Sequence, residues 1–446
     1  MKRVLLFACL AMLPLSYAAA EGYQVNVQST KQSGMGHVGA AMKLGAESMH
    51  FNPAGLGFLD KQIDLSVGAA GVFSKASYTT LDGAKKFNSD NDPSTPLYAY
   101  AGFKIYDNLS AGISLNTPYG SAMNWGKNWA GAHLVQDISL KAFSLQPTLS
   151  YRPFDRLSIG AGMMVMFGNF SLSRALFSSG DMADLAAMVP QLAPLAEKYK
   201  DITPVYAELS GDAGIKLGFN VGAMFDVNDQ LTVGVSYRSK VNMEVGEGTA
   251  KIVYANEAEI KQIPGLQIPP LDMGYLNAQL PLPSNFNVGA TYKPNDKWLF
   301  SGELQFVGWG AYKSLNVKFY PEKDLGKYNI SAPKNYENTI IYRAGAQYAL
   351  TERFDLRLGA YFDESPVKSD FLNPETPSMD KLGLTTGFSF RPAEAFSIDF
   401  AFNYVTGFGR TGSYTDKATL TQQPRKFEGE YDVHAFTVAL GLAYTF

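Results

Sequence analysis

The chain ends in "FTVALGLAYTF", residues 436–446, and this stretch alternates strictly between two kinds of side chain. Large apolar residues occupy every second position from Phe436 to Phe446, and only Thr, Ala and Gly lie between them. A period of two is typical of a β-strand, whose successive side chains point to opposite faces. A soluble sheet would turn its bulky face inward and place polar residues outside. Here the second face is small and uncharged, which favours a strand that faces lipid.

The same alternation recurs along most of the chain, for example in residues 215–227, 231–237 and 396–404. Counting such segments gives about 14 strands. The strands are expected to begin near Ile63, Pro96, Leu109, Lys141, Leu157, Gly214, Leu231, Asn285, Trp298, Thr339, Phe354, Lys381, Phe396 and Asp432.

The links between these strands alternate between short turns, such as Asp107-Asn108, and long loops. Short turns at one end and long loops at the other are the signature of an outer-membrane barrel with an even number of strands. Lipid cannot satisfy an open sheet edge, so the sheet must close on itself. We therefore predict an all-β fold, a transmembrane antiparallel β-barrel over residues 61–446. The long loops are expected at 76–95, 118–138, 174–212, 244–283, 319–337, 364–379 and 409–431.

Aromatic residues cluster at the short-turn ends of the strands, where they would form one of the interfacial girdles of a membrane barrel. The terminal Phe446 resembles an outer-membrane assembly signal, so the barrel assembly machinery and outer-membrane lipid are expected partners. The alternative is a soluble β-fold in which these rings are core residues. The girdle candidates are Tyr151, Phe225, Tyr292, Trp298, Tyr348, Phe354, Phe390, Phe396, Tyr444 and Phe446.

The first 20 residues read as a secretory signal peptide. A positive start at Lys2 and Arg3 precedes an apolar run and a small-residue site ending at Ala20. The only cysteine, Cys9, lies in that run, so the exported chain would have neither a disulfide nor a Cys-ligated metal. We place the protein in the bacterial outer membrane.

Charge and histidine spacing exclude several other classes. The full chain carries a formal charge of -3, and loss of Lys2 and Arg3 would make it more negative, which argues against nucleic acid as a partner. None of the four histidines lies at metal-ligand spacing from another, so we expect no metal site and no cofactor.

Residues 21–60 precede the first strand and show no regular period. They contain "SGMGHVGAAM", residues 33–42, in which Gly34, Gly36 and Gly39 match a dinucleotide-binding pattern. That pattern needs an apolar strand before it and a helix after it. Here the lead-in is polar and Asn52-Pro53 would break a helix. We predict instead that the segment plugs the barrel lumen, where glycines let backbone pack against the wall.

The chain resembles the FadL outer-membrane long-chain fatty acid transporters over its whole exported length. The similar segments are the start at residues 21–26, the glycine-rich stretch, and Asn-Pro-Ala at the end of the plug. Further similar segments are "GISLNTPYG" at 112–120, "LPLPSNFNVGATYKPNDKWLFSGELQFVGW" at 280–309 and "FDESPV" at 362–367.

This resemblance implies a 14-stranded barrel with an N-terminal hatch. We expect transport by passive diffusion, because nothing near Glu21 resembles an energy-coupling box. Cargo would be captured outside, enter an internal apolar pocket and leave through a side gap where the third strand bends inward. The hatch residues Asn52, Pro53 and Ala54 would lie near that gap. In this chain the bend falls either at Gly112 or nearer Pro118.

Apolar residues in the expected outer loops are candidates for capturing cargo. The alternative is that they pack on each other and on the barrel rim. The candidates are Leu185, Leu192, Leu266 and Trp125.

Several charged residues are expected to face the lumen, where a cation could hold a carboxylate head group. Arg343 and Arg357 are the candidates for this role. The alternative is that these cations pair with lumenal carboxylates or with the plug. The other expected lumenal charges are Lys216, Arg238, Glu303, Asp355 and Asp399.

The sequence therefore predicts an outer-membrane transporter of hydrophobic compounds, with long-chain fatty acids as cargo and aromatic hydrocarbons or other small hydrophobic molecules as the alternative. An outer-membrane lipid enzyme is disfavoured, because no G-x-S-x-G motif occurs and neither His133 nor His434 lies in a catalytic motif. The plug and the apolar loops argue against a water-filled porin. We expect a monomer.

Overall fold

The structure is a computed structural model that describes residues 22–417 and 423–446. The predicted signal peptide at 1–20, with its Cys9, lies outside the described residues.

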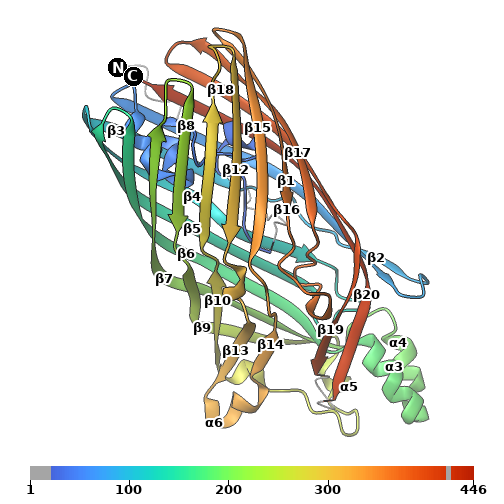
Figure 1. Ribbon diagram of the computed structural model, residues 1–446. Coiled ribbons are helices and arrows are strands. Elements are labelled where there is room, and N and C mark those ends of the chain that lie inside the picture. Colours follow the sequence, from blue (N-terminus) through green and yellow to red (C-terminus); the bar gives the residue numbers. More distant parts are fainter. Residues whose placement is uncertain (1–21, 418–422) are drawn as a thin grey trace, which may run out of the picture.

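The wall is one closed antiparallel sheet of twenty strand segments (Figure 1). Its segments are β1 (Ile63–Thr80), β2 (Lys86–Asn88), β3 (Leu97–Tyr106), β4 (Leu109–Asn124), β5 (Asp137–Phe154), β6 (Leu157–Phe177), β7 (Val205–Asp226), β8 (Leu231–Arg238), β9 (Val241–Tyr254), β10 (Tyr275–Leu282), β11 (Asn285–Tyr292), β12 (Trp298–Val307), β13 (Ser314–Tyr320), β14 (Ile330–Pro333), β15 (Thr339–Thr351), β16 (Phe354–Asp363), β17 (Lys381–Ala393), β18 (Phe396–Gly407), β19 (Arg410–Lys417) and β20 (Pro424–Thr445).

These segments make about 14 wall strands. Five strands are each interrupted once, into β8 and β9, β10 and β11, β12 and β13, β14 and β15, and β18 and β19, while β2 is a short hairpin strand. The barrel closes where β1 pairs with β20, in a register that runs from Asp64 opposite Thr445 to Thr80 opposite Gly429. Closure removes the sheet edges, as a lipid environment requires.

The predicted strand starts are confirmed at ten positions, and β3 begins one residue later than expected, at Leu97. Three segments begin earlier than expected: β5 at Asp137, β7 at Val205 and β20 at Pro424. The interrupted strands β10–β11 and β14–β15 also begin earlier, with their first segments at Tyr275 and Ile330. The wall thus extends well into segments that the sequence pattern assigned to loops.

The extension was missed because the polarity of the two faces inverts along a strand. In β20, Phe436 and Leu440 point outward, as lipid-facing residues do. Nearer the loops, Phe427 and Tyr431 are buried inside while Glu430 is exposed outside. Beyond the membrane the outer face meets water, so the wall takes the pattern of a soluble sheet.

In β7 a bulge adds to this inversion. The register with β6 shifts between Met166 and Gly168, which lie opposite Lys216 and Ala213. An extra residue exchanges the two faces of a strand. A period of two read back from Ile215 therefore ends at the bulge.

Short helices occupy the plug and the long loops. In the plug they are α1 (Thr30–Ser33), η1 (Gly45–Glu47), α2 (Ser48–Phe51) and η2 (Pro53–Phe58). In the loops they are α3 (Ser179–Met188), η3 (Pro190–Leu192), α4 (Ala193–Lys198), α5 (Glu257–Ile260), η4 (Leu271–Met273), η5 (Trp309–Ala311), α6 (Glu322–Leu325), η6 (Gly326–Tyr328) and η7 (Ser369–Phe371). Among the residues that the structure describes, no helix is both long and apolar enough to cross a membrane.

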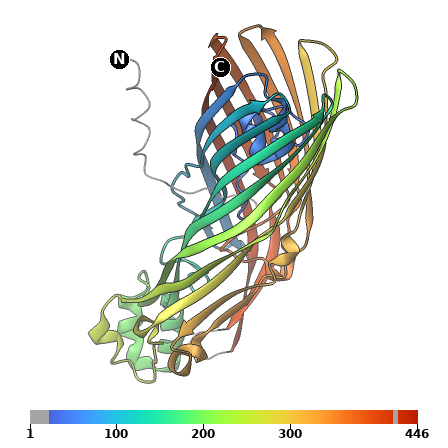
Figure 2. The same ribbon diagram turned by 90° about the vertical axis from the view of Figure 1, so that its left-hand side faces the viewer.

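The plug, residues 22–60, lies in the lumen near the end that carries the short turns, here called the turn end (Figure 2). Glycines let it approach the wall. A Cβ on Gly234 of β8 would lie 1.9 Å from the carbonyl oxygen of Ala40, and one on Gly36 would lie 2.5 Å from that of Ala344. Gly34 packs on Gly387 of the wall in the same way, whereas Gly39 faces Phe51 within the plug.

Candidate functional site

A largely apolar cavity lies between the plug and the long loops, with about 760 Å³ of space around its lining when adjoining open solvent is included. Strands β5, β6, β9, β10 and β13 supply most of its wall, because their inward residues are apolar beyond the membrane. The apolar side chains that line it are Ile138, Leu140, Ala142, Phe170, Ala213, Met243, Val245, Ala278, Leu280 and Leu315.

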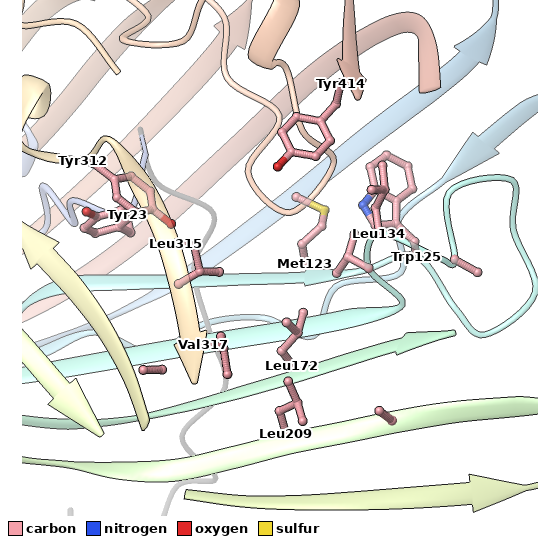
Figure 3. Close-up of a cluster of buried hydrophobic side chains, with 14 of the residues drawn as sticks. Tyr23, Met123, Trp125, Leu134, Leu172, Leu209, Tyr312, Leu315, Val317 and Tyr414 are labelled. Carbon is pink, nitrogen blue, oxygen red and sulfur yellow. The ribbon is translucent and has the colours of Figure 1, made fainter. Parts of the chain in front are cut away.

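Aromatic rings from the plug and the rim lie at one side of this cavity. Tyr23 of the plug packs edge-to-face on Trp309, with ring centroids 4.8 Å apart, and on Tyr312 at 5.8 Å. The Tyr23 hydroxyl donates a hydrogen bond to the carbonyl oxygen of Pro281. Tyr23 and Tyr312 both line the cavity and lie side by side in Figure 3. The start of the plug thus forms part of the cavity wall.

The loop residues predicted to capture cargo lie around this apolar region. Trp125 is buried, stacks on Trp129 at 4.6 Å, and donates from Nε1 to the carbonyl oxygen of Pro374 at 2.9 Å. It lies beside Met123 and Leu134 in the buried cluster of Figure 3.

The other three predicted residues, Leu185, Leu192 and Leu266, are half-buried and pack against the same cluster. The most open apolar side chains of these loops are instead Met188, 73% exposed, and Met273, 77% exposed. The loops therefore pack inward through their leucines and expose apolar side chains at their tips. The role of these residues in capturing cargo stays a prediction.

The third wall strand, β4, breaks its pairing beside Pro118. Its ladder with β3 is regular through Gly112, which lies opposite Gly102, and ends where Asn116 pairs with Tyr98. Its ladder with β5 shifts between Asn116 and Tyr119. Because proline has no N–H to donate, it interrupts a ladder. The irregularity of β4 thus lies at Pro118, while Gly112 sits in regular strand with Met49 of the plug against it.

The plug fills the place that β3 leaves along β4. The N–H of Val25 donates to the carbonyl oxygen of Pro118 at 2.9 Å, and the N–H of Gly120 donates to that of Tyr23 at 2.8 Å. The side chain of Gln28 donates to the carbonyl oxygen of Thr117 at 2.8 Å. A short plug segment therefore acts as a substitute strand at the break.

Asn52 holds the end of the plug against two wall strands. Its Nδ2 donates to the carbonyl oxygens of Ala40 at 2.6 Å, Ala223 in β7 at 3.1 Å and Val235 in β8 at 3.2 Å. Its Oδ1 accepts from the N–H of Ala54 at 3.1 Å, so it also caps η2.

Pro53 and Ala54 continue this contact with the wall. Pro53 starts η2, and a Cβ on Gly160 of β6 would lie 2.4 Å from its carbonyl carbon. The carbonyl oxygen of Ala54 accepts from the hydroxyls of Ser158 at 2.6 Å and Ser150 at 3.2 Å. The motif docks on β5, β6, β7 and β8, on the turn-end side of the break in β4.

Both arginines proposed as head-group ligands are buried and already have partners. Arg343 donates to the carbonyl oxygen of His37 at 2.9 Å and to Asn26 Oδ1 at 3.0 Å, and lies 3.8 Å from Glu303. Arg343 thus binds the plug, and its role toward cargo stays a prediction.

Arg357 is held by the wall. It donates to Gln347 at 2.8 Å and to Ser389 at 2.6 Å, and lies 3.8 Å from Asp355 and 3.9 Å from Asp399. Two carboxylates balance its charge, and its role toward cargo also stays a prediction. Lys216 is half-buried and pairs with Glu244 at 2.7 Å, near the apolar cavity.

Sequence reasoning placed Arg238 in the lumen without offering it as a ligand candidate, and it gave His50 no role. Arg238 ends β8 and is 7% exposed, and its NH2 group donates to the carbonyl oxygen of His50 at 2.6 Å. His50 belongs to plug helix α2 and not to a membrane strand. Burial, followed by the positive charges of Arg238 and Arg343, holds the pKa of His50 well below its usual value, so the ring is neutral. The only signal for Arg238 in the sequence is the alternation of side chains along β8, which places Arg238 on the inward face.

Comparison with known proteins decides the family. The family model described as outer membrane protein transport protein (OMPP1/FadL/TodX) matches residues 11–446. The chain belongs to this family. The chain is therefore an outer-membrane β-barrel transporter of hydrophobic compounds, from a family of transporters and channels rather than enzymes.

Its relatives are similar over nearly their whole length. A 47 kDa outer membrane protein of Pasteurella multocida is 26% identical over 91% of both chains. A long-chain fatty acid transport protein of Salmonella typhi is 23% identical over 96% of this chain and 95% of the relative.

Two solved structures share the fold. A Pseudomonas aeruginosa FadL homologue has a TM-score of 0.75 at 21% identity, covering 95% of this chain and 99% of that one. The Ralstonia pickettii toluene transporter TbuX has a TM-score of 0.66 at 17% identity, covering 93% and 97%. Among the described residues, no group of three or more His, Cys, Asp or Glu side chains could hold a metal ion.

Proposed function

We propose that this protein takes up long-chain fatty acids across the outer membrane by passive diffusion. The observation that carries this proposal is the largely apolar cavity between the loops and the plug, whose lining would shield an acyl chain from water. Polar side chains of Glu375, Thr376 and Ser121 also line it, so one end of an amphipathic molecule could remain hydrogen-bonded.

Capture would begin at the exposed apolar loop tips. Met188 and Met273 have flexible side chains, which can adjust to an acyl chain in different positions and conformations. Leu185, Leu192 and Leu266 lie behind them and continue the apolar surface toward the buried cluster that includes Trp125. A molecule that enters between these loops would lose water progressively, which favours its movement inward.

Exit would follow the break in β4. The plug segment around Val25 bonds to Pro118 and Gly120 through only a few backbone hydrogen bonds. Each such bond contributes about 1 kcal/mol net, so a segment held in this way can leave its place without unfolding the wall. Cargo would then pass sideways between β3 and β4 into the membrane, while Asn52, Pro53 and Ala54 keep the rest of the plug docked.

Aromatic hydrocarbons are the second candidate cargo, favoured by the rings of Tyr23, Tyr312 and Phe170 around the cavity. A relative named as a fatty acid transport protein supports the first candidate. The toluene transporter shares the fold at 17% identity, which carries no weight on cargo. We further propose that the protein acts as a monomer and is inserted by the barrel assembly machinery.

Equilibrium binding separates the two cargo classes. Radiolabelled oleate is titrated onto the folded, detergent-purified protein, with toluene as competitor. Saturable oleate binding that toluene does not displace supports a fatty acid transporter. Absent oleate binding with retained toluene binding would assign the protein to aromatic hydrocarbons.

A further inference from the structure

A polar cleft opens on the outside of the wall, just beyond the lipid-facing band of β5, β6 and β7. These three strands are neighbours in the sheet and lie side by side in Figure 1. The cleft is distinct from the cargo cavity, because its floor residues point outward while their sequence neighbours Leu172 and Leu209 are buried inside. The polar residues that carry the argument are Asn124, Asp137, Ser171, Ser173, Glu208 and Ser210.

The outer face of these strands changes from apolar to polar where the membrane ends. Phe143 of β5 and Phe167 of β6 lie opposite each other and stack on the outer face, with ring centroids 5.5 Å apart. Two outward positions nearer the loops, Ser139 lies opposite Ser171. At about 3.3 Å per residue along tilted strands, Ser171 lies about 10 Å beyond Phe167 along the membrane normal. The cleft is therefore at the level of the outer-leaflet head groups and not in open solution.

The floor of the cleft is a row of hydroxyl groups. Ser139 of β5 lies opposite Ser171 of β6, which in turn lies opposite Ser210 of β7. The next row toward the loops is Asp137, Ser173 and Glu208. Because serine side chains are short, the floor is low, and the two carboxylates stand at its sides.

A loop closes the upper side of the cleft, while the carboxylates below it stay accessible. Lys127 lies 4.2 Å from the centre of the Tyr206 ring and donates to its hydroxyl, which holds the loop against the outer face of β7. Asp137 is exposed, and no described residue donates a hydrogen bond to its carboxylate. The nearest cation to Glu208 is Lys251, at 3.9 Å. Both carboxylates can therefore accept hydrogen bonds from a ligand.

This mixture of groups suits a polyhydroxyl ligand. Serine hydroxyls and the amide of Asn124 both donate and accept, and carboxylates accept, which matches the hydroxyl groups of a sugar. A phosphate is disfavoured, because Asp137 and Glu208 would repel it and Lys127 is already bound to Tyr206. A protein partner would need an apolar centre to its interface, and the outward side chains here are polar.

We propose that this cleft binds the sugar head group of a glycolipid in the outer leaflet. The serine hydroxyls of the floor and the carboxylates of Asp137 and Glu208 would hydrogen-bond the sugar. The acyl chains of the same molecule would lie against the apolar band around Phe143 and Phe167, so the site continues the surface that the barrel already presents to the membrane. This continuity favours a membrane-anchored sugar over a free one. The inference does not depend on the cargo.

The test titrates purified lipopolysaccharide onto the full exported chain in detergent, with phosphatidylglycerol as the lipid without a sugar. We expect saturable binding of lipopolysaccharide that is weaker by about tenfold or more in Ser171→Trp, because the indole would fill the floor of the cleft. Ser331→Trp, at an exposed serine of β14, is the matched control and should bind as the wild type does. Oleate binding should be unchanged in both variants, since neither side chain lines the cargo cavity.

Asp137→Ala covers the case in which Ser171→Trp does not assemble. Asp137 is exposed, so its loss should not affect folding, and it should weaken lipopolysaccharide binding several-fold. Deacylated saccharide from the same lipopolysaccharide should compete with the intact glycolipid. The proposal is overturned by unchanged affinity of an assembled variant, by absence of binding to the wild type, or by failure of the saccharide to compete. Equal weakening of phosphatidylglycerol binding would also overturn it, because the cleft would then bind lipid without recognising sugar.

Discussion

Glu303 on wall strand β12 holds Gly39 of the plug, accepting its backbone N–H at a distance of 2.7 Å. The same carboxylate oxygen accepts the N–H of Ala40, also at 2.7 Å. Two backbone donors that converge on a buried carboxylate form a strong, directional contact, because one partner is charged. This contact joins the wall and the plug at the centre of the glycine-rich stretch.

Glu303→Ala should loosen the plug without preventing barrel assembly. Each lost charge-assisted hydrogen bond costs about 1.5–3 kcal/mol, and two N–H groups would remain buried and unpaired. We expect faster entry of a hydrophilic antibiotic into cells, with normal heat-modifiable migration on gels. Leu304→Ala is the control, because Leu304 is the neighbouring residue and points outward. An antibiotic entry rate equal to wild type would show that this contact does not hold the plug.

Asn52→Ala should impair fatty acid uptake while leaving an assembled barrel. The substitution removes three hydrogen bonds to backbone carbonyls and one N-cap, together about 2–4 kcal/mol of plug docking. Uptake of radiolabelled oleate by cells is the measurement. Asn256→Ala removes a similar N-cap from loop helix α5 and should leave uptake normal. If Asn52→Ala cells took up oleate at the wild-type rate, the hatch role of Asn52 would be refuted.

Gly234→Ala should disturb plug docking through a single methyl group. Its Cβ would lie 1.9 Å from the carbonyl oxygen of Ala40, so wall and plug must move apart. We expect a lower yield of folded barrel or a leak of small solutes. Gly246→Ala in β9 is matched, because nothing lies within 4 Å of its added Cβ. Wild-type yield and permeability for both variants would mean that the plug tolerates a wider gap than the structure implies.

Trp125→Ala should weaken binding of cargo by loosening the loops over the cavity. It removes a stacked contact with Trp129 and a hydrogen bond to Pro374, and large-to-small changes of a buried Trp cost about 3–5 kcal/mol. The oleate dissociation constant should rise several-fold. Trp298→Ala is a control at the lipid-facing turn end, where no change in affinity is expected. Equal oleate affinity of the wild type and Trp125→Ala would show that Trp125 does not contribute to cargo binding.

The sequence was enough to predict the barrel, its strand number and the plug. Lipid requires a continuous outward apolar face. Every second residue of a membrane strand is therefore apolar, and this alternation is visible in the sequence between Phe436 and Phe446. The plug was recognised by the absence of such a period before Ile63. Glycines such as Gly36 were correctly expected to pack against wall, because a Cβ there would meet Ala344.

The upper wall and the contacts of the lumenal arginines could not be predicted in the same way. Beyond the membrane the two faces exchange polarity, as between Glu430 and Leu440 of β20, so the rule for lipid-facing strands no longer applies. Most hydrogen-bond partners of Arg238 and Arg343 come from the plug, which has no period from which a facing residue could be deduced. Period two placed four lumenal cations inside, but only the folded plug and wall show which groups each of them contacts.

The most direct test of the account is oleate uptake by cells whose barrel carries Ala142→Phe. Ala142 is buried and lines the apolar cavity, so a phenyl ring there would fill the space through which cargo is proposed to pass. Ala290→Phe, on the lipid-facing side of β11, is the matched control. With both variants folded, the account predicts that Ala142→Phe loses most oleate uptake and that Ala290→Phe keeps it. Undiminished uptake by a folded Ala142→Phe barrel would contradict the claim that cargo passes through this cavity.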